Sequence, residues 1–372
     1  MVKVAISGFG RIGRLAFRIG LLKHMDDLEF VAINTSGSMD VGGWAHLVNY
    51  DTTYRKFDLE VTVQEVRSPS EVTDQDSLIG YLQVRSRNVR VPVFAQRDPT
   101  KLPWDELGVD VVIESTGQFT DEQGAKKHMT AGAKRVVISA PVKGGNIPTY
   151  VLGVKDYPSS GEVKEVISNA SCTTNCVSPV AAVMMSNFGV AKAMMTTIHA
   201  YTEDQRLQDG SHHDLRRARA AAANIVPTTT GAAIAATETI PSLRGLFDGV
   251  ALRVPVISGS ITDFVFVTKK MVQVDEVNEA FREAASLPLY SGILGVSEKP
   301  LVSSDIIGTP QSAIVDLSLT QVIDGDLVKV MAWYDNEWAY SCRLVEQTIR
   351  VGKTTGSIVP TDPLTSHFLV PV

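Results

Sequence analysis

The chain has few cysteines and no long hydrophobic run. Only three cysteines occur among 372 residues, and none lies in a C-x-x-C pair, so we expect neither a disulfide framework nor a metal site, and a reducing compartment is favoured. No apolar run approaches the roughly 18 residues of a membrane span, and the first residues lack the charged region, apolar core and cleavage site of a secretory signal. We therefore expect a cytoplasmic protein that does not span a membrane.

An excess of positive charge is also lacking. Lys and Arg total 35 against 41 Asp and Glu, a formal net charge of −6, which gives no general attraction to nucleic acid or to an anionic membrane. One basic cluster, Arg216, Arg217 and Arg219, stands next to Asp214. We interpret it as a salt-bridged surface or subunit contact, and expect no nucleic-acid partner.

The remaining composition is typical of about two globular domains. With 44% hydrophobic residues, the chain is long enough to bury a full core. In the first half, short β-prone runs alternate with helix-like segments, a pattern that predicts a doubly wound parallel sheet. We expect its strands at Val2–Ser7, Phe30–Asn34, Val109–Ser115, Arg135–Ser139 and Tyr150–Leu152, with an elaborated hairpin region between Thr62 and Val91.

The pattern changes after residue 171. Longer strand-like runs are interspersed with helix-like segments near 172–187, 230–240 and 274–287, which favours an α+β domain with one large mixed sheet. Its strands are expected at Met194–His199, Val250–Pro255, Ile261–Thr268, Ile314–Leu319 and Leu327–Tyr334. The expected division is a first domain over residues 1–171, a second over 172–337, a helix over 338–352 that packs back on the first domain, and a tail over 354–372 that serves as an arm or strap.

A glycine motif follows the first expected strand. Gly8-Phe9-Gly10-Arg11-Ile12-Gly13 fits G-x-G-x-x-G between a buried strand and an apolar, helix-like run to Leu22. In that context the glycines allow a tight turn, a close backbone approach to a pyrophosphate, and close packing of the helix. The motif predicts a dinucleotide site that includes Gly8, Gly10, Arg11 and Ile12.

The end of the second expected strand bears on the choice of dinucleotide. NAD enzymes usually place an Asp or Glu there, which binds the adenosine ribose hydroxyls, but this chain reads Asn34-Thr35-Ser36-Gly37. Without that carboxylate nothing repels a 2′-phosphate, and the hydroxyls of Thr35 and Ser36 can donate hydrogen bonds to one. NADP is therefore admissible, although no adjacent residue supplies an arginine clamp.

A thiol stands where a β-run over residues 165–169 gives way to a helix, in Ser168-Asn169-Ala170-Ser171-Cys172-Thr173-Thr174-Asn175-Cys176. The free N–H groups and positive dipole end of a helix lower the pKa of such a thiol, and the thiolate is the nucleophilic form. The flanking hydroxyls favour this role for Cys172 over that of a buried structural cysteine. Cys176, one turn further, is interpreted as packing.

A second candidate group ends the run Thr196-Thr197-Ile198-His199. An imidazole titrates near neutral pH, so His199 can take the proton released when a carbonyl is attacked by Cys172, or hold that oxygen by a hydrogen bond. A structural histidine is the alternative, because the sequence does not place His199 in contact with Cys172.

Several segments taken together resemble phosphorylating glyceraldehyde-3-phosphate dehydrogenase, and the resemblance covers nearly all of residues 1–353. They are Gly8–Arg14, Glu114–Gly117, Ser168–Cys176, His199–Gln205, Asp214–Arg219, Pro227–Ala233 and Trp333–Trp338. The resemblance implies a Rossmann NAD(P)-binding domain, a catalytic and tetramerisation domain, and a homotetramer. It also implies oxidation of D-glyceraldehyde 3-phosphate with capture of the acyl group by inorganic phosphate, giving 1,3-bisphosphoglycerate. Cys172 would form the thiohemiacetal and thioester, with His199 assisting proton removal.

The resemblance also implies two anion sites. Thr202, Asp204 and Arg253 match positions near the substrate phosphate, and a second set matches the site for attacking phosphate, namely Ser171, Thr173, Thr230 and Gly231. Hydroxyls, backbone N–H groups and an arginine suit tetrahedral oxyanions. By itself, Thr228-Thr229-Thr230-Gly231 is more typical of a simple helix cap.

The implied cofactor contacts fall at both ends of the chain. The first group comprises Gly10, Arg11 and Ile12 at the pyrophosphate, Asn34 on the adenosine side, and Ser115, Thr116 and Gly117 at a further strand end. The second comprises Asn336 at the nicotinamide carboxamide and Tyr340 against the ring.

Two departures from the NAD-specific glycolytic members favour NADP, with some use of NAD. Those members carry Asp at the place of Thr35 and a Leu-Pro pair where this chain has Gly210-Ser211, whereas the photosynthetic, NADP-using members carry a small residue and Ser at the second place. Thr35, Ser36 and Ser211 therefore join the expected cofactor residues. Ala339 and Cys342 replace the usual Gly and Asn, and the region 62–91 is longer than usual.

Two other functions stay open. Erythrose-4-phosphate dehydrogenase shares the fold and the Cys–His chemistry, but not the Ala200-Tyr201-Thr202 pattern. A non-catalytic nucleotide-binding or RNA-binding relative would be expected to lose Cys172 or His199, or to gain a basic face, and this chain has done neither.

Overall fold

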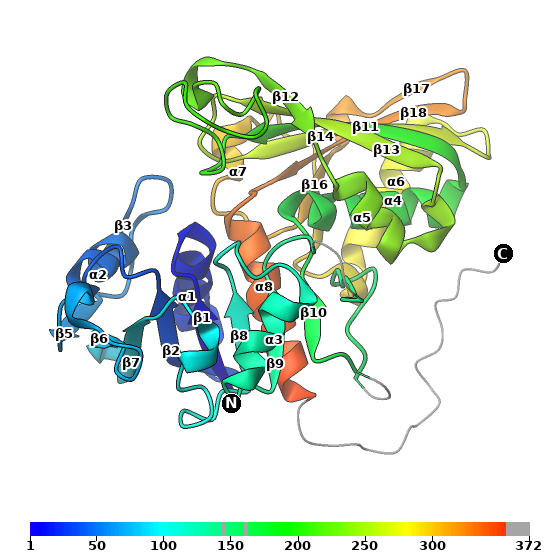
Figure 1. Cartoon of the computed structure of the whole chain (residues 1–372). Coiled ribbons are helices and arrows are strands. Elements are labelled where there is room, and N and C mark those ends of the chain that lie inside the picture. Colours follow the sequence, from blue (N-terminus) through cyan, green and yellow to red (C-terminus); the bar gives the residue numbers. More distant parts are fainter. Residues whose placement is uncertain (143–145, 160–162, 355–372) are drawn as a thin grey trace. The chain divides into compact units, whose positions relative to one another are not determined.

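A computed structural model describes residues 1–142, 146–159 and 163–354, so almost all of the tail expected over 354–372 lies outside the described residues. The described chain divides into two units. The first comprises Met1–Tyr150, Tyr157–Ala170 and the chain from Ser341, and the second comprises Val151–Asp156 and Ser171–Tyr340. Each unit is built around its own eight-stranded sheet (Figure 1).

The first sheet has the order β10-β9-β8-β1-β2-β7-β6-β5. Neighbours from β10 to β7 are parallel, and β6 and β5 add an antiparallel edge. These strands are β1 (Val2–Ser7), β2 (Leu28–Thr35), β5 (Thr62–Glu65), β6 (Leu78–Val84), β7 (Val89–Ala95), β8 (Val111–Glu114), β9 (Arg135–Ile138) and β10 (Val166–Ser168). The helices of this unit include α1 (Arg11–Lys23), α2 (Val41–Asn49) and α3 (Glu122–Thr130). The predicted parallel sheet and the hairpin region are confirmed.

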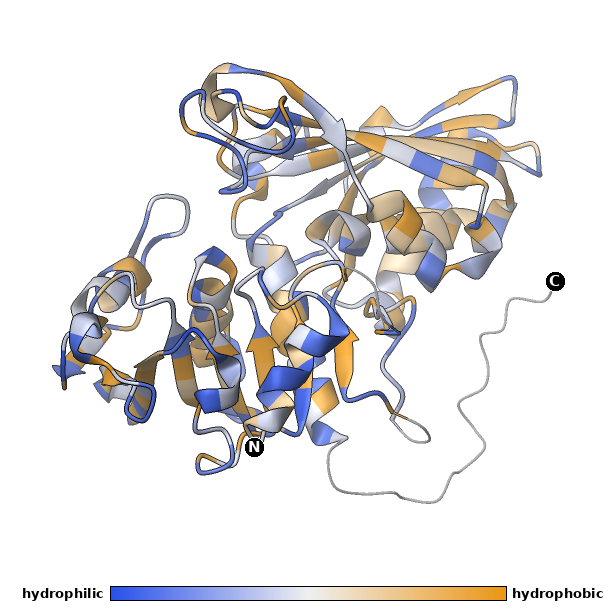
Figure 2. Cartoon of the chain, viewed as in Figure 1, coloured by the Kyte–Doolittle hydropathy of each residue, from blue (hydrophilic) through white to orange (hydrophobic). Residues whose placement is uncertain are grey.

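The inner strands of this sheet are apolar because both faces are covered. Every residue of β8 is buried, as are five of the six in β1, and these strands carry the apolar colouring in Figure 2. Parallel strands with both faces buried read as continuous hydrophobic runs. The strand expected at Tyr150–Leu152 is wrong, since Val151 forms only an isolated bridge with Lys155, and three apolar residues do not distinguish a strand from a buried turn.

The second sheet is mixed, as predicted. Its order is β12-β13-β11-β14-β18-β16-β15, and β17 pairs with β18. Only the pairs β11–β13 and β15–β16 are parallel. The strands are β11 (Val190–Ala200), β12 (Val226–Thr229), β13 (Phe247–Val254), β14 (Ser260–Thr268), β15 (Leu294–Ser297), β16 (Ala313–Asp316), β17 (Gln321–Ile323) and β18 (Leu327–Tyr334).

Helices cover one face of the second sheet. Figure 1 shows α4 (Cys172–Phe188), α5 (Ala232–Thr239) and α6 (Val274–Ser286) on the same side of it. Burial alternates along β11 accordingly: Met195 and His199 are buried, whereas Met194 is 65% exposed. Since side chains in a strand alternate between faces, this register places His199 on the helix-covered face.

The last helix, α8 (Trp338–Lys353), spans the residues predicted for it. Its first turn belongs to the second unit, and from Ser341 the chain belongs to the first. Sequence patterns did not indicate α2, β12, β15 or α7 (Ser303–Ile306), which are short or nearly all apolar. Within residues 1–142, 146–159 and 163–354, no helix is long and apolar enough to cross a membrane.

Candidate active site

Cys172 is the first residue of α4. The preceding Ala170 has a positive φ of 57°, which turns the chain sharply from β10 into the helix. Ser171 caps the helix, because its hydroxyl accepts the N–H of Thr174 at 3.0 Å. The local sequence therefore presents the thiol at a helix N-terminus, as the strand-to-helix pattern predicted.

His199 lies against this thiol. Its Nε2 is 3.4 Å from Sγ of Cys172, and its Nδ1 is 2.6 Å from the carbonyl oxygen of Ala200. A carbonyl only accepts hydrogen bonds, so Nδ1 carries the proton of the neutral ring and Nε2 presents its lone pair to the thiol. The structure thus brings together the two residues that the sequence could not place in contact.

The electrostatics of the pair differ from the sequence-based expectation. Burial raises the pKa of the Cys172 thiol, although the positive charge of Arg253 and the hydroxyl and N–H of Thr173 oppose the increase. Burial and, second, the charge of Arg253 lower the pKa of His199 to about 3. The prediction of a lowered thiol pKa is wrong for the resting site, because desolvation outweighs the helix terminus. The pair is therefore a neutral thiol beside a neutral imidazole.

Tyr334, at the end of β18, contacts the His199 ring and two threonines next to the Cys–His pair. Its hydroxyl lies 2.9 Å from Oγ1 of Thr173 and 2.8 Å from Oγ1 of Thr197, and its ring meets that of His199 edge-on at 6.0 Å. This residue was missed by the sequence reasoning. The available signal was an aromatic residue on the inward positions of a half-buried strand, which is equally typical of simple core packing.

An arginine lies beside the imidazole. Arg253 of β13 pairs in register with His199 of β11, and its Nη1 donates to Oγ1 of Thr202 at 2.9 Å. Its Nε is buried and has no hydrogen-bond partner among the described residues. Arg253 and Thr202, two of the residues matched to the substrate phosphate, are thus in contact.

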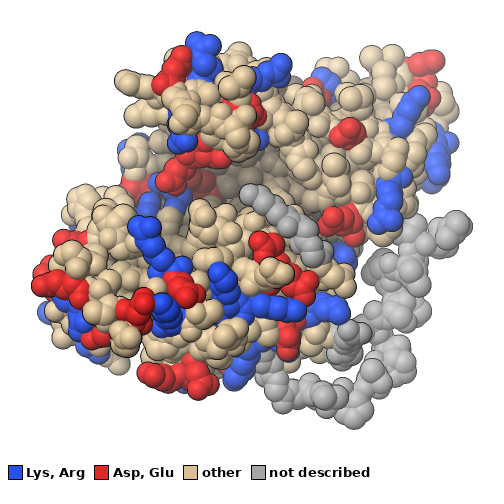
Figure 3. All heavy atoms as spheres, viewed as in Figure 1, with Lys and Arg blue, Asp and Glu red and all other residues tan. Residues whose placement is uncertain are grey.

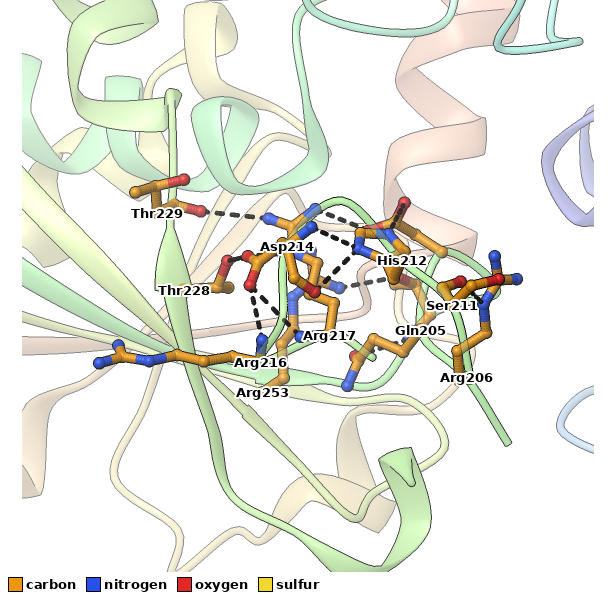
Figure 4. Close-up of polar contacts among 12 residues, drawn as sticks. Gln205, Arg206, Ser211, His212, Asp214, Arg216, Arg217, Thr228, Thr229 and Arg253 are labelled. Atoms are coloured by element: carbon orange, nitrogen blue, oxygen red, sulfur yellow. Dashed lines mark hydrogen bonds and ion pairs between the residues drawn. The ribbon is translucent and has the colours of Figure 1, made fainter. Parts of the chain in front are cut away.

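Asp204, the third of those residues, is held by Arg217. Nη1 of Arg217 donates to Asp204 at 2.6 Å, and Nε donates to Thr228 at 3.0 Å. Nη2 reaches the carbonyl of Thr229 at 3.4 Å. Figure 4 shows Arg217 near Thr228, Thr229 and Asp214. The sequence reasoning recognised a salt-bridged arginine here but missed that Arg217 ties the 202–204 segment to β12.

The residues matched to attacking phosphate lie at two helix starts. Ser171 and Thr173 begin α4, and Thr230 and Gly231 precede α5. Oγ1 of Thr230 accepts the N–H of Ala232 at 3.2 Å, which is a cap-like bond. A Cβ added to Gly231 would meet nothing within 4 Å. Both the cap and the open space for an anion are therefore features of this segment.

The glycine motif has the geometry that a pyrophosphate requires. Gly8 has φ +95°, and a Cβ on Gly13 would lie 2.1 Å from the carbonyl oxygen of Gly8, whereas a Cβ on Gly10 would meet nothing within 4 Å. The first turn of α1 has no acidic residue and no side-chain cap. The N–H groups that begin α1 at Arg11 and Ile12 therefore suit an anion. The Arg11 side chain itself is paired with Asp51 at 2.8 Å.

The strand end at Asn34–Ser36 is more constrained than the sequence indicated. The amide of Asn34 exchanges two 3.0 Å hydrogen bonds with the backbone of Gln96. The Thr35 hydroxyl, 2% exposed, donates to the carbonyl of Phe94 at 3.0 Å. The expectation that Thr35 donates to a phosphate is therefore wrong. Ser36 is exposed, and its hydroxyl donates to Oγ of Ser38 at 3.0 Å.

The same strand pairing supplies an arginine that the sequence reasoning missed. Since β2 pairs in parallel with β7, Thr35 lies beside Ala95, and Arg97 follows two residues later. Arg97 is exposed, and within the described residues no hydrogen bond or ion pair occupies its guanidinium. Only the strand order could have indicated Arg97, because it places this residue at the same sheet edge as Thr35, some sixty positions earlier in the sequence.

The remaining expected cofactor residues divide between the units. Ser115, Thr116 and Gly117 follow β8 in the first unit, where Oγ of Ser115 donates to the carbonyl of Gly8 at 2.7 Å. Ser211, Asn336 and Tyr340 belong to the second unit. Ser211 is exposed and Tyr340 buried, and Oδ1 of Asn336 accepts the hydroxyl of Ser260 at 2.9 Å.

Neither the face shown in Figure 3 nor the described metal-ligating side chains indicate a competing site. On the face shown in Figure 3, Lys and Arg are interspersed with Asp and Glu. In the part of the chain that the structure describes, no three His, Cys, Asp or Glu side chains are grouped to hold a metal ion.

A glycine loop on a doubly wound parallel sheet, together with a Cys–His pair beside an arginine on a mixed sheet, defines a nicotinamide-dinucleotide oxidoreductase of two domains. Family models identify which one. Residues 2–122 match the NAD binding domain of glyceraldehyde 3-phosphate dehydrogenase, and residues 171–336 match its C-terminal domain. The chain belongs to the glyceraldehyde 3-phosphate dehydrogenase family.

Curated relatives come from bacteria and from photosynthetic eukaryotes. The glyceraldehyde-3-phosphate dehydrogenase of Streptomyces coelicolor is 50% identical over 351 residues, covering 94% of this chain and 98% of the relative. A chloroplastic form named GAPB from Arabidopsis thaliana is 49% identical, covering 93% and 73%. The chloroplastic A form from Scenedesmus vacuolatus is 50% identical, covering 89% and 100%.

Proposed function

We propose that this chain catalyses the phosphate-dependent oxidation of D-glyceraldehyde 3-phosphate, with NADP preferred and NAD also used. The observation that carries the proposal is the 3.4 Å approach of Cys172 Sγ to His199 Nε2 at the start of α4. A thiol within reach of an oriented base is the arrangement required for covalent catalysis at a carbonyl carbon.

In the first step the Cys172 sulfur attacks the aldehyde carbon. A C–S bond forms, the carbonyl π bond breaks, and the thiol proton passes to Nε2 of His199. Nε2 is unprotonated because the pKa of the ring is lowered to about 3; this makes the ring a weak base, so it takes the proton only as the C–S bond forms. Its Nδ1–H stays on the carbonyl of Ala200, which fixes the orientation of the ring during the transfer.

In the following steps the thiohemiacetal on Cys172 becomes a thioester, which phosphate cleaves. A bound nicotinamide dinucleotide supplies the hydride acceptor for the oxidation. Before this oxidation Nε2 of His199 returns the thiol proton to the new oxygen, which gives the thiohemiacetal hydroxyl, and it then accepts the hydroxyl proton as the hydride leaves. When phosphate attacks the thioester carbon, the C–S bond breaks and the Cys172 sulfur leaves as a thiolate, which takes the proton back from His199. Arg253 and Thr202 hold the substrate phosphate, while Thr230, Gly231 and the N-terminus of α4 receive the attacking phosphate.

The preference for NADP rests on the edge formed by β2 and β7. Thr35 puts no carboxylate beside the adenosine ribose. The Ser36 hydroxyl, which donates to Oγ of Ser38 at 3.0 Å on the surface, can turn to a 2′-phosphate, and so can the exposed guanidinium of Arg97, which has no partner among the described residues. An arginine is the side chain best suited to bind a phosphate in two-pronged fashion. The chloroplastic relatives are consistent with this choice.

We also propose a homotetramer. The open face of the second sheet exposes large apolar side chains, with Met194 at 65% and Val250 at 50%. Exposed apolar side chains that gather on one sheet face favour contact with another subunit. Sedimentation equilibrium tests the assembly. A cytoplasmic location stays a prediction from the sequence.

The function is tested by a spectrophotometric assay of NADP and NAD reduction. We expect reduction that requires glyceraldehyde 3-phosphate and inorganic phosphate together, and that a thiol-alkylating reagent abolishes. Erythrose 4-phosphate serves as the competing substrate. A higher kcat/KM for erythrose 4-phosphate, or activity that survives alkylation, would overturn the proposal.

A further inference from the structure

Three buried polar side chains of the first unit form a hydrogen-bonded chain that the proposed reaction does not use. Nε1 of Trp104 lies 3.1 Å from Nδ1 of His128, and Nε2 of His128 lies 2.9 Å from Oε2 of Glu114. Trp104 and His128 are 0% exposed and Glu114 is 1% exposed. Burial of an ionisable pair to this depth is unfavourable unless its polar atoms are matched.

The direction of these hydrogen bonds is fixed by the indole. An indole N–H only donates, so Nδ1 of His128 accepts and the ring proton of the neutral imidazole is on Nε2. Nε2–H then donates to Oε2 of Glu114. The chain therefore runs one way, from Trp104 through His128 of α3 to the carboxylate at the end of β8.

The other carboxylate oxygen of Glu114 builds a turn. Oε1 accepts the N–H of Thr116 at 2.8 Å and also its hydroxyl. The same hydroxyl accepts the N–H of Gln118 at 3.0 Å. Gly117, with φ +71°, lies between these bonds. The conformation of residues 115–118 therefore depends on where the carboxylate of Glu114 points.

This turn lies directly against the glycine loop. Oγ of Ser115 donates to the carbonyl of Gly8 at 2.7 Å, and its backbone N–H donates to Ser7 at 2.7 Å. A Cβ on Gly8 would lie 2.5 Å from the backbone nitrogen of Thr116. Because no space separates them, a displaced Thr116 would displace the loop as well.

We propose that Glu114 is a positioning residue of the dinucleotide site. Held by His128 and Trp104, its carboxylate fixes the turn Ser115–Gly117 against the glycine loop and so sets the affinity for the cofactor, without touching it. This inference rests on the proposed role of that loop and turn in binding NADP and NAD.

The first test is Glu114→Gln, which keeps the size of the side chain but replaces one oxygen with a donor. If the new amide NH₂ faces Thr116, two donors meet, because the backbone N–H of Thr116 also donates. If it faces His128, two donors meet again, because Nε2–H donates. The ring escapes this conflict only by moving its proton to Nδ1, where it meets the N–H of Trp104. We expect the Kd of NADP and NAD, measured by fluorescence titration without substrate, to rise at least about tenfold. Because the interaction acts through binding, kcat at saturating cofactor should stay within about threefold and the KM for the aldehyde should not change.

A rescue variant separates positioning from general loss of packing. In Glu114→Gln/Trp104→Phe the indole donor is gone, so His128 can carry its proton on Nδ1 and accept from the new amide. We expect the Kd to fall at least about threefold from that of Glu114→Gln, toward that of Trp104→Phe alone, whereas two independent packing losses would add and raise the Kd further. A double variant that binds the cofactor no better than Glu114→Gln would refute the proposed hydrogen bonds from Trp104 through His128 to Glu114.

The controls distinguish this inference from the proposed function. Lys126→Ala changes an exposed residue of the same helix and should leave the Kd unchanged. If the parent binds neither cofactor, the proposed function fails; if the parent binds and folded Glu114→Gln binds equally well, the positioning role fails.

Should Glu114→Gln not fold, His128→Phe removes the same donor while filling its space, and an unchanged Kd there refutes the role. Nitrogen NMR of the parent with labelled histidines gives an independent check, because a ring proton on Nδ1 of His128 would contradict the proposed direction of these hydrogen bonds.

Discussion

His199 and Arg253 occupy paired positions on the neighbouring parallel strands β11 and β13. Side chains at paired positions point to the same face of a sheet, so a fixed positive charge lies beside the proposed catalytic base. That charge, after burial, is the second cause of the lowered pKa of His199. The strand register therefore adds to the effect of burial on the pKa of His199, and it places beside the imidazole the arginine that we propose binds the substrate phosphate.

Cys172→Ser should abolish phosphorylating activity and leave cofactor binding near normal. A serine hydroxyl stays protonated at neutral pH, and the neutral imidazole of His199 is a weak base for it. Turnover and cofactor titration are the two measurements. Turnover within about tenfold of the parent would refute the assignment of Cys172 as nucleophile.

His199→Asn should slow formation of the acyl-enzyme by roughly 10²–10⁴-fold, the usual range for a positioned general acid–base group. The variant should also weaken the pH dependence of thiol alkylation, because the Cys172 thiol no longer shares its proton with Nε2. Rapid-quench acylation and alkylation rates across pH measure both effects. Unchanged acylation would assign His199 a structural role.

Arg217→Met should make the stability of the folded protein depend less on pH in the acidic range. Burial acts to raise the pKa of Asp204, but the hydrogen bond and charge of Arg217 lower it overall. A lowered folded-state pKa contributes stability above the unfolded value, about 3.9, and loses it as pH falls through the folded value. The difference in Tm between parent and variant should therefore be constant above about pH 5 and shrink below about pH 4. A difference that does not change with pH would show that Asp204 is not the linked group.

The sequence predicts most of the fold because apolar periodicity is local. Val2–Ser7 and Leu327–Tyr334 agree with β1 and β18 residue for residue. The thiol at a helix start and the glycine loop were also readable, since each depends on a few consecutive residues. Short elements such as β12 were missed because four residues do not establish a period.

What the sequence did not give arises from pairing between distant segments. Arg97 and Ser36 share an edge only because β2 pairs with β7. The Thr35 hydroxyl is unavailable to a ligand because Phe94, on that same partner strand, accepts it. The raised pKa of Cys172 comes from burial, which a helix-terminus argument does not include. His128 reads as an ordinary helix residue until Glu114 and Trp104 are placed around it.

Arg97→Ala should weaken NADP and leave NAD nearly unchanged. Loss of a charged donor to a phosphate removes a contact that NAD does not make, so kcat/KM for NADP should fall about tenfold or more and that for NAD should stay within about twofold. Arg90→Ala, which removes an exposed arginine stacked on Tyr81, is the matched control. An equal loss with both cofactors would exclude a role at the 2′-phosphate.

Thr35→Asp should shift the cofactor preference toward NAD. A carboxylate at the end of β2 would accept hydrogen bonds from free ribose hydroxyls and repel a 2′-phosphate. At an effective dielectric of about 20, two unit charges about 4 Å apart cost roughly 4 kcal/mol, so even a partly screened contact should weaken NADP by tens to hundreds of fold. Thr35→Asn is the matched control, because it has the same shape without the charge and shares the loss of the hydroxyl bond to Phe94. Ser211→Pro should act in the same direction but more weakly, since it deletes only a hydroxyl and an N–H. Steady-state kcat/KM with each cofactor decides the matter, with Tm measured for every variant. A parent that strongly prefers NAD, or a Thr35→Asn variant that shifts as far as Thr35→Asp, would refute the electrostatic account of this pocket.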